Sequence, residues 1–102
     1  MEKEVKVLNT IQTKIEAAKM HLKKNYHVER IGVFGSYARG EQSKKSDIDI
    51  LVEFEKGHKD FFNFMRLKHY LEDLLGRKVD LVMEKAIKER LKARILSEVL
   101  YV

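Results

Sequence analysis

The sequence predicts a mixed α/β (α+β) protein, with a small sheet of about three strands flanked by helices in the order α-β-α-β-α-β-α. Two observations lead to this prediction. Three longer segments carry apolar residues at helical spacing, and three short runs rich in β-forming residues are interleaved with them. Hydrophobic residues make up 44% and charged residues 36% of the 102 residues, which is typical of a globular chain rather than a disordered one. We expect residues 1–102 to form one domain.

The first element is a predicted amphipathic helix over residues 3–24. Its apolar residues recur at steps of three and four, which places them on one helical face, while Lys and Glu occupy the other. Asn25 follows, and asparagine can adopt the left-handed conformation that ends a helix. The apolar face consists of Val5, Leu8, Ile11, Ile15, Ala18 and Leu22.

A buried strand is predicted next, over residues 30–34, because this short run is β-branched and aromatic and Gly35 stops it. A short helix over residues 37–41 follows, and we expect Ser36 to cap it. Residues 42–46 are polar and are predicted to form a loop. The chain thus passes directly from a buried strand into a Gly-Ser turn.

The second half of the chain predicts two more strands and two more helices. Residues 47–54 alternate at their start and are rich in β-formers, and residues 78–82 form a third short strand with one acid in its middle. Helical spacing predicts a helix over residues 60–75, ended by Gly76, and a last helix over residues 84–99.

The composition of the chain narrows the class of protein and ligand. Lys and Arg number 21 and Asp and Glu 16, a formal net charge of +5 that favours a polyanionic ligand or an acidic partner. There is no cysteine, which excludes a disulfide framework and a thiolate metal site. No apolar run approaches the roughly 18 residues that cross a membrane, and we expect a cytoplasmic protein without membrane contact.

Two carboxylates at the head of the second predicted strand suggest a metal site. Asp47 and Asp49 are two residues apart, so strand alternation projects both from the same face. Mg²⁺ prefers oxygen ligands and is commonly held by one or two carboxylates together with substrate phosphates. Asp80 is the strand-borne candidate that is left; from a neighbouring strand it would hold a second ion or accept the proton of an attacking hydroxyl. A surface acid paired with Lys78 is the alternative interpretation of Asp80.

The Gly35-Ser36 turn is the second part of the predicted site. It follows a strand and precedes a short helix, so backbone N–H groups and a hydroxyl can face phosphate oxygens. The dipeptide is informative because of its position, 12 residues ahead of Asp47. The turn and the carboxylates together suit the in-line transfer of a nucleotidyl group from a nucleoside triphosphate.

The string Gly35-Ser36, ten residues, then Asp-Ile-Asp at 47–49 resembles the signature of the DNA polymerase beta-like nucleotidyltransferase superfamily. The fuller string Gly-Ser-Tyr-Ala-Arg-Gly-Glu, followed by Ser-Asp-Ile-Asp-Ile-Leu-Val, is similar to its small prokaryotic branch, the minimal nucleotidyltransferase (MNT) family. The resemblance covers nearly the whole chain and implies the nucleotidyltransferase fold.

The resemblance also implies a role for each matching residue. It makes Asp47, Asp49 and Asp80 the catalytic carboxylates and the ligands of one or two Mg²⁺ ions. It makes Gly35 and Ser36 contacts of the nucleoside triphosphate, with ATP as the substrate. None of these five positions departs from the family's pattern.

An activity and a partner follow from the same resemblance. MNT proteins are typically encoded beside a HEPN-domain toxin RNase and act as its antitoxin, and characterised members transfer AMP from ATP to a tyrosine of that toxin. The chain is therefore expected to be a Mg²⁺-dependent nucleotidyltransferase, a protein adenylyltransferase (AMPylator), that associates with its toxin and makes no stable nucleic-acid contact of its own. Two alternatives stay open: nucleotidyl transfer to a small molecule or an RNA end, and neutralisation of the toxin by binding alone.

Three further features have two interpretations each. Arg39 matches a basic position of the family and either contacts phosphate or forms a structural salt bridge. Tyr37 either packs in the core or stacks on a base. A basic stretch in the last predicted helix is either its solvated face or a surface for RNA or an acidic partner. This stretch comprises Lys85, Lys88, Arg90, Lys92 and Arg94.

Overall fold

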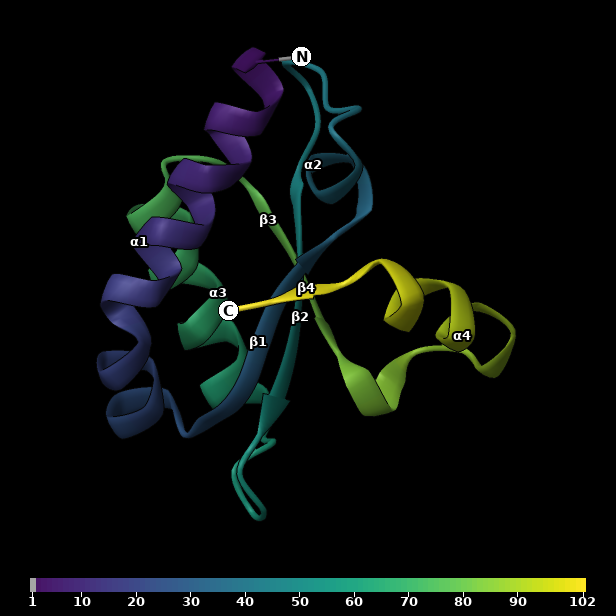
Figure 1. The fold of residues 1–102 in the computed structure, drawn as a ribbon. Helices are drawn as coiled ribbons and strands as arrows, with labels where there is room; N and C mark the ends of the chain where they lie inside the picture. Colours follow the sequence, from purple (N-terminus) through teal and green to yellow (C-terminus); the bar gives the residue numbers. More distant parts are fainter. Residues whose placement is uncertain (1) are drawn as a thin grey trace.

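The computed structural model describes residues 2–102, and the side chains of residues 6–102. Its elements follow one another largely in the predicted order, with changes near the C-terminus (Figure 1). None of the helices described is both long and apolar enough to span a membrane. The elements are α1 (Glu2–Tyr26), β1 (Val28–Phe34), α2 (Gly35–Arg39), β2 (Ile48–Phe54), α3 (Phe61–Leu75), β3 (Val79–Met83), the 3₁₀ turn η1 (Glu84–Ala86), α4 (Glu89–Glu98) and β4 (Leu100–Tyr101).

The strands form a mixed sheet in the order β3-β2-β1-β4. Strand β1 runs antiparallel to β2 and to β4, whereas β2 and β3 are parallel. The register pairs Asp49 of β2 with Phe34 at the end of β1 and with Asp80 of β3. The predicted small mixed sheet flanked by helices is confirmed, and the two-residue β4 adds a strand that the sequence did not indicate.

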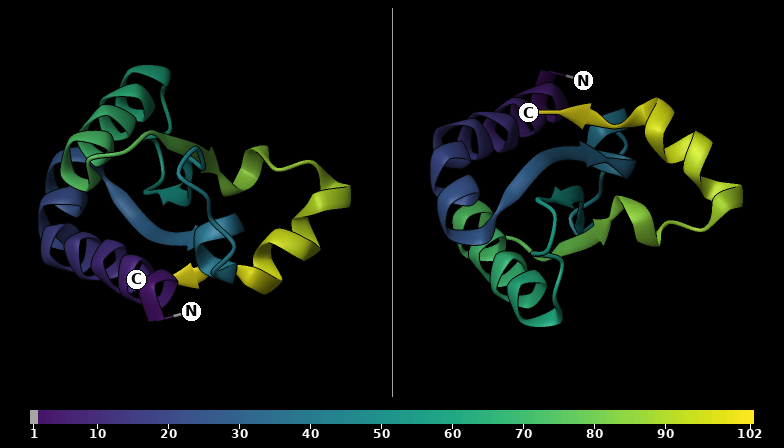
Figure 2. Two further views of the ribbon diagram at one scale, coloured as in Figure 1. Left: turned by 90° about the horizontal axis from the view of Figure 1, so that it is seen from above. Right: turned by 90° about the horizontal axis from the view of Figure 1, so that it is seen from below.

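Helices α1 and α3 lie side by side over one face of the sheet, and α4 extends from the other side (Figures 1 and 2). Ile48, Ile50 and Val52 of β2 join the core cluster that these two helices cover, and all three are fully buried. Ile15 of α1 is buried against them to the same degree. Full burial of one such side chain contributes about 1.5–3 kcal/mol. Because strand side chains alternate, Asp49 between two core isoleucines faces away from the core.

Helix α1 ends two residues beyond the predicted residue 24, and its cap differs from the expected one. The expectation that Asn25 takes the left-handed conformation is wrong, because Asn25 remains helical and its side-chain amide hydrogen-bonds to the carbonyl of His21 at 3.2 Å. His27 adopts that conformation instead, with φ 57°, and its N–H donates to the carbonyl of Lys23 at 3.1 Å. Histidine, like asparagine, is among the residues that tolerate this region.

The prediction of one continuous helix over residues 84–99 is wrong. The chain instead forms η1 and α4, which are separated by Ile87 and Lys88 in extended conformation, with ψ 131° and 137°. Val99 is extended as well and leads the chain into β4. Pairing of β4 with β1 at Gly32 therefore overrides the helical periodicity at the end of the chain.

Gly32 makes room for this last strand. A Cβ atom at this position would lie 2.8 Å from Cγ2 of Val99 and 2.9 Å from the carbonyl oxygen of Leu100. Both distances are too short for a real side chain, so any larger residue would push β4 away from β1. The glycine thus allows β4 to hold the C-terminal end of α4 beside the end of β1.

Candidate functional site

Three aspartates lie at one end of the sheet. Asp49 and Asp80 are paired across the parallel strands β2 and β3, with their Cα atoms in register. Asp47 lies just before β2, two residues ahead of Asp49, and its charge acts on the Asp49 carboxyl. The structure therefore brings together the three acids that the sequence singled out. Their roles as catalytic residues and metal ligands stay predictions.

The Asp49 carboxyl is difficult to ionise in this setting. Burial raises the pKa of Asp49 from its usual 3.8 to about 6; the charge and a hydrogen bond of Asp80 and the charge of Asp47 add to the rise, while Arg39 opposes it. Asp49 is partly buried, whereas Asp47 and Asp80 are exposed. Acids that repel one another in this way favour a bound cation, because the cation removes the repulsion.

The donor set suits a hard cation that shares its coordination with other ligands. Asp47, Asp49 and Asp80 offer carboxylate oxygens, the donors that Mg²⁺ prefers. Among the residues that the structure describes, no group of three or more His, Asp or Glu side chains converges as a complete metal site. A Mg²⁺ ion that takes one or two carboxylates here, and phosphate and water oxygens for the rest, fits this arrangement.

The turn between β1 and α2 lies directly against Asp49. Gly35 is buried and has φ 74°, in the region that favours glycine. A Cβ atom on Gly35 would overlap Oδ2 of Asp49 and would lie 2.8 Å from its Cγ. Glycine is therefore required here both for its backbone conformation and for the close approach of the carboxylate. The turn at Gly35 therefore packs directly against β2 at Asp49.

The predicted capping role of Ser36 is wrong. Helix α2 begins at Gly35, two residues earlier than the predicted residue 37, so Ser36 lies inside the helix. Phe34 occupies the N-cap position and makes no capping hydrogen bond with its side chain. Gly35 has a positive φ and turns the chain at the end of β1, so the helix starts earlier in the sequence than predicted. Ser36 is partly exposed, and its triphosphate contact stays a prediction.

Glu98 reaches this turn from the other end of the chain. Its Oε1 accepts the Gly35 N–H at 3.2 Å, and Nη1 of Arg39 donates to both carboxylate oxygens at 3.1 and 3.2 Å. Nε of Arg39 also donates to Glu41 at 3.2 Å. The structure thus shows the salt bridge for Arg39, and a phosphate contact stays a prediction. Sequence reasoning missed Glu98 because nothing local marks a residue 59 positions away from its partner.

Tyr37 packs in the core, as the first of its two interpretations predicts. Its side chain is 1% exposed and belongs to the main hydrophobic cluster. The guanidinium carbon of Arg77 lies 6.0 Å from the centre of the ring. The buried ring is therefore not placed to stack on a nucleotide base.

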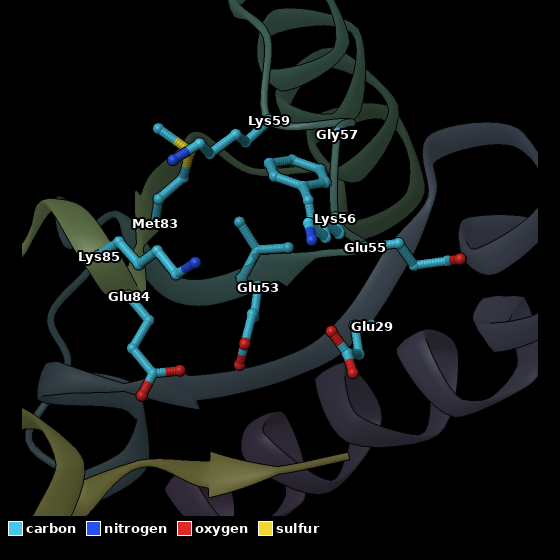
Figure 3. Close-up of a pocket in the computed structure, with 11 residues that line it drawn as sticks. Glu29, Glu53, Glu55, Lys56, Gly57, Lys59, Met83, Glu84 and Lys85 are labelled. Carbon is cyan, nitrogen blue, oxygen red and sulfur yellow. The ribbon is translucent and has the colours of Figure 1, made fainter.

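A cavity of about 420 Å³ lies at the opposite end of β2 and β3 from the aspartates (Figure 3). Lys59 and Lys85 contribute amino groups to its lining, and Glu53 and Glu84 contribute carboxylates. Arg30 bridges these two glutamates at 2.6 and 3.0 Å, and this ion pair lowers the pKa of Glu53. None of the three aspartates lines the cavity, so it is not part of the candidate site.

The basic stretch near the C-terminus is spread over η1, the extended link and α4. Four of its five cations are exposed and Lys92 is partly buried. Helix α4 buries none of its residues. A solvated face agrees with this exposure, and contact with RNA or an acidic partner stays a prediction.

Known proteins resemble this chain over most of its length. A family model described as a nucleotidyltransferase domain matches residues 15–102. The protein adenylyltransferase MntA of Thermococcus cleftensis is 45% identical over 95 residues, which are 93% of this chain and 95% of that protein. A solved structure described as a minimal nucleotidyltransferase superimposes with a TM-score of 0.78 at 41% identity and covers 91% of this chain and 93% of its own. A crystal structure of a toxin–antitoxin with AMP-PNP gives a TM-score of 0.68 at 27% identity, covering 84% of this chain and 70% of the other.

Proposed function

Because the chain belongs to the nucleotidyltransferase domain family, we propose that it is a protein adenylyltransferase that transfers AMP from ATP to a tyrosine hydroxyl of a HEPN-domain toxin and so acts as its antitoxin. The observation that carries the proposal is the in-register pair Asp49 and Asp80, beside Asp47 and the Gly35 turn. These groups form the minimal set that in-line nucleotidyl transfer needs, because the chemistry depends on positioning and charge.

In the proposed reaction the tyrosine oxygen attacks the α-phosphorus of ATP. A new P–O bond forms to tyrosine, the bond between the α-phosphorus and the bridging oxygen breaks, and pyrophosphate leaves with that oxygen. Asp47 and Asp49 would hold Mg²⁺, which when bound neutralises charge that develops on the phosphate oxygens. Asp80, in register with Asp49, would take the proton of the hydroxyl or help to hold a second ion.

The turn at the end of β1 supplies the triphosphate contacts in this proposal. Ser36 lies in the first turn of α2, where its hydroxyl and the backbone N–H groups suit phosphate oxygens. Arg39 adds a positive charge to a site that otherwise holds aspartates. The N–H of Gly35 is already bonded to Glu98, so Gly35 would contribute through its close approach to Asp49.

The nucleotide and the partner are supported by the relatives. MntA of Thermococcus cleftensis carries the name of a protein adenylyltransferase, and the chain matches it over nearly its full length. The toxin–antitoxin with AMP-PNP combines a nucleotide analogue and a toxin in one assembly. ATP as the donor and a toxin as the acceptor are the corresponding assignments for this chain.

Intact mass spectrometry of the partner tests the proposal. The purified protein, ATP and Mg²⁺ are incubated with a HEPN-domain RNase encoded beside it, and we expect the RNase to gain the mass of one or more adenylyl groups and to lose its activity. The double variant Asp47→Asn/Asp49→Asn should give no mass gain, because it removes both carboxylates beside the turn. EDTA should have the same effect on the wild-type protein.

The same experiment separates the alternatives. Neutralisation by binding alone predicts that the double variant still inhibits the RNase fully although no adenylyl group is added. Transfer to a small molecule or an RNA end predicts that the RNase keeps its mass while ATP is consumed once that acceptor is supplied. Either result would refute the proposed transfer to protein.

A further inference from the structure

Glu98 links the last helix to the candidate site. Helix α4 buries no residue of its own, and β4 holds its C-terminal end against β1 at Gly32. At that end the Glu98 side chain is 20% exposed and meets both the Arg39 guanidinium and the Gly35 N–H. The contacts join positions 59 and 63 residues apart in the sequence.

Two glutamates hold the Arg39 guanidinium near the candidate site. Glu98 and Glu41 hold it through Nη1 and Nε at 3.1–3.2 Å. Oε1 of Glu98, one of these acceptors, also accepts the N–H of Gly35, which lies directly against the Asp49 carboxylate, so the guanidinium is held close to this aspartate. A guanidinium beside aspartates that repel one another gains energy by pairing with them. Such a pair would neutralise Asp49, the carboxylate that the cation needs.

We propose that Glu98 is a positioning residue of the transferase: it anchors Arg39 at the turn and keeps the guanidinium away from Asp47 and Asp49, which stay available to the metal. The inference rests on the proposed function, because it takes these aspartates as metal ligands. Charge-assisted hydrogen bonds to Glu98 restrict an arginine side chain that is otherwise free to adopt many rotamers. The pairing of β4 with β1 fixes Glu98 in turn.

Calorimetric titration of Mn²⁺ into the full-length protein, without nucleotide or acceptor, tests the role of Glu98. Glu98→Ala releases Arg39 to the aspartates, and we expect the affinity for Mn²⁺ to fall about tenfold. Glu98→Gln keeps an acceptor oxygen for the Arg39 guanidinium and should lose less. The double variant Glu98→Ala/Arg39→Ala should recover the wild-type affinity or exceed it, because no guanidinium is left to compete.

The matched control is Glu89→Ala, which removes an exposed glutamate from the first turn of the same helix and should leave the affinity unchanged. A purely structural role of Glu98 predicts that the double variant binds Mn²⁺ no better than Glu98→Ala. That result, or an unchanged affinity in Glu98→Ala, would overturn the inference and leave the transferase proposal standing. If Glu98→Ala does not fold, Glu98→Gln with and without Arg39→Ala makes the same comparison. A wild-type protein that binds no Mn²⁺ would refute the metal-dependent function itself.

Discussion

Asp49 carries an electrostatic cost in the folded protein that its position in the site explains. Asp49 lies between two core isoleucines in the sequence, and its side chain is partly buried. Asp80 and Asp47 are its acidic neighbours in the fold. These surroundings raise the pKa of Asp49 to about 6, so at neutral pH the carboxyl is mostly ionised but its charge costs free energy in the folded protein. The arrangement is unfavourable for the free protein and favourable for one that binds a cation.

Asp49→Asn should therefore stabilise the metal-free protein at neutral pH. Asparagine removes the buried charge, and we expect the free energy of unfolding to rise by about 1–2 kcal/mol at pH 7.5, allowing for solvent access to the carboxyl. The pKa of Asp49 is higher in the folded protein than in the unfolded chain. The wild-type protein therefore loses stability as pH rises from about 3.8 to about 6, and below that range Asp49 costs the folded state nothing because it is protonated. Urea denaturation at pH 7.5 and at pH 3.5 measures the gain.

The gain should vanish at the lower pH, where Asp49 is protonated and resembles asparagine. Asp73→Asn, on the exposed surface of α3, is the control and should change stability little at either pH. An equal gain for Asp49→Asn at both pH values would show that the ionisation of Asp49 is not its source.

The sequence singled out the residues that the fold brings together at the candidate site, but not the contacts around them. Asp47, Asp49 and Gly35 were found because strand alternation and a glycine after a strand are local signals. Asp80 was found as an acid placed inside a strand. Glu98 has no such signal, because its pairing with Arg39 depends on the path of the chain after α4. Only the fold shows that contact.

At the level of elements, Asn63 joins the end of α1 to the start of α3. Its side chain is 7% exposed and donates to the carbonyl of Tyr26 at 2.7 Å and to that of His58 at 3.0 Å. Its backbone N–H donates to Asp60, the N-cap of α3, at 2.9 Å. The carbonyl at the end of α1 is one that has no partner within the helix, so Asn63 satisfies a group that burial would otherwise leave unpaired.

Asn63→Ala should destabilise the protein by about 1–3 kcal/mol, because two carbonyl groups lose their hydrogen-bond partner. The loss is measured as a lower midpoint in urea denaturation at pH 7.5. Asp73→Ala, an exposed substitution on the same helix, serves as the control and should stay within about 0.5 kcal/mol of the wild-type protein. If Asn63→Ala lowers the free energy of unfolding no more than the control does, these hydrogen bonds make no net contribution to stability.

Elements with long helical periodicity were predictable, and those fixed by pairing were not. The helix predicted over residues 60–75 starts one residue later in the structure, and α1 extends beyond its prediction by one residue at its start and two at its end. The residues from 84 onward also show helical spacing, yet the helical conformation is interrupted at Ile87 and the segment ends as the strand β4. A strand of two residues is too short to show alternation, and its partner Gly32 is distant in sequence.

At the scale of the whole molecule, the candidate site lies on the side of the sheet that α1 and α3 do not cover. Helices α1 and α3 cover the opposite face, and α4 stands to the side (Figure 2). The chain has a formal net charge of +5, whereas the candidate site gathers three aspartates. A triphosphate therefore meets a locally negative site in a positively charged protein. In the proposed function, a divalent cation between the aspartates and the phosphates would remove this repulsion.

Nucleotide should stabilise this protein only together with Mg²⁺. For a non-hydrolysable ATP analogue at about 100 times its Kd, binding to the folded state adds about 2.7 kcal/mol, which for a chain of this size raises Tm by roughly 10 °C or more. Thermal unfolding followed by circular dichroism measures the shift, with the analogue alone, Mg²⁺ alone and both together. We expect a large shift only with both, because the three aspartates repel the phosphates unless a cation lies between them. In Asp47→Asn/Asp49→Asn we expect no shift that depends on Mg²⁺, because the two carboxylates proposed to hold the cation are gone. A full shift in EDTA would mean that the turn and Arg39 bind the triphosphate without metal, and that the aspartates are not the metal ligands of this site.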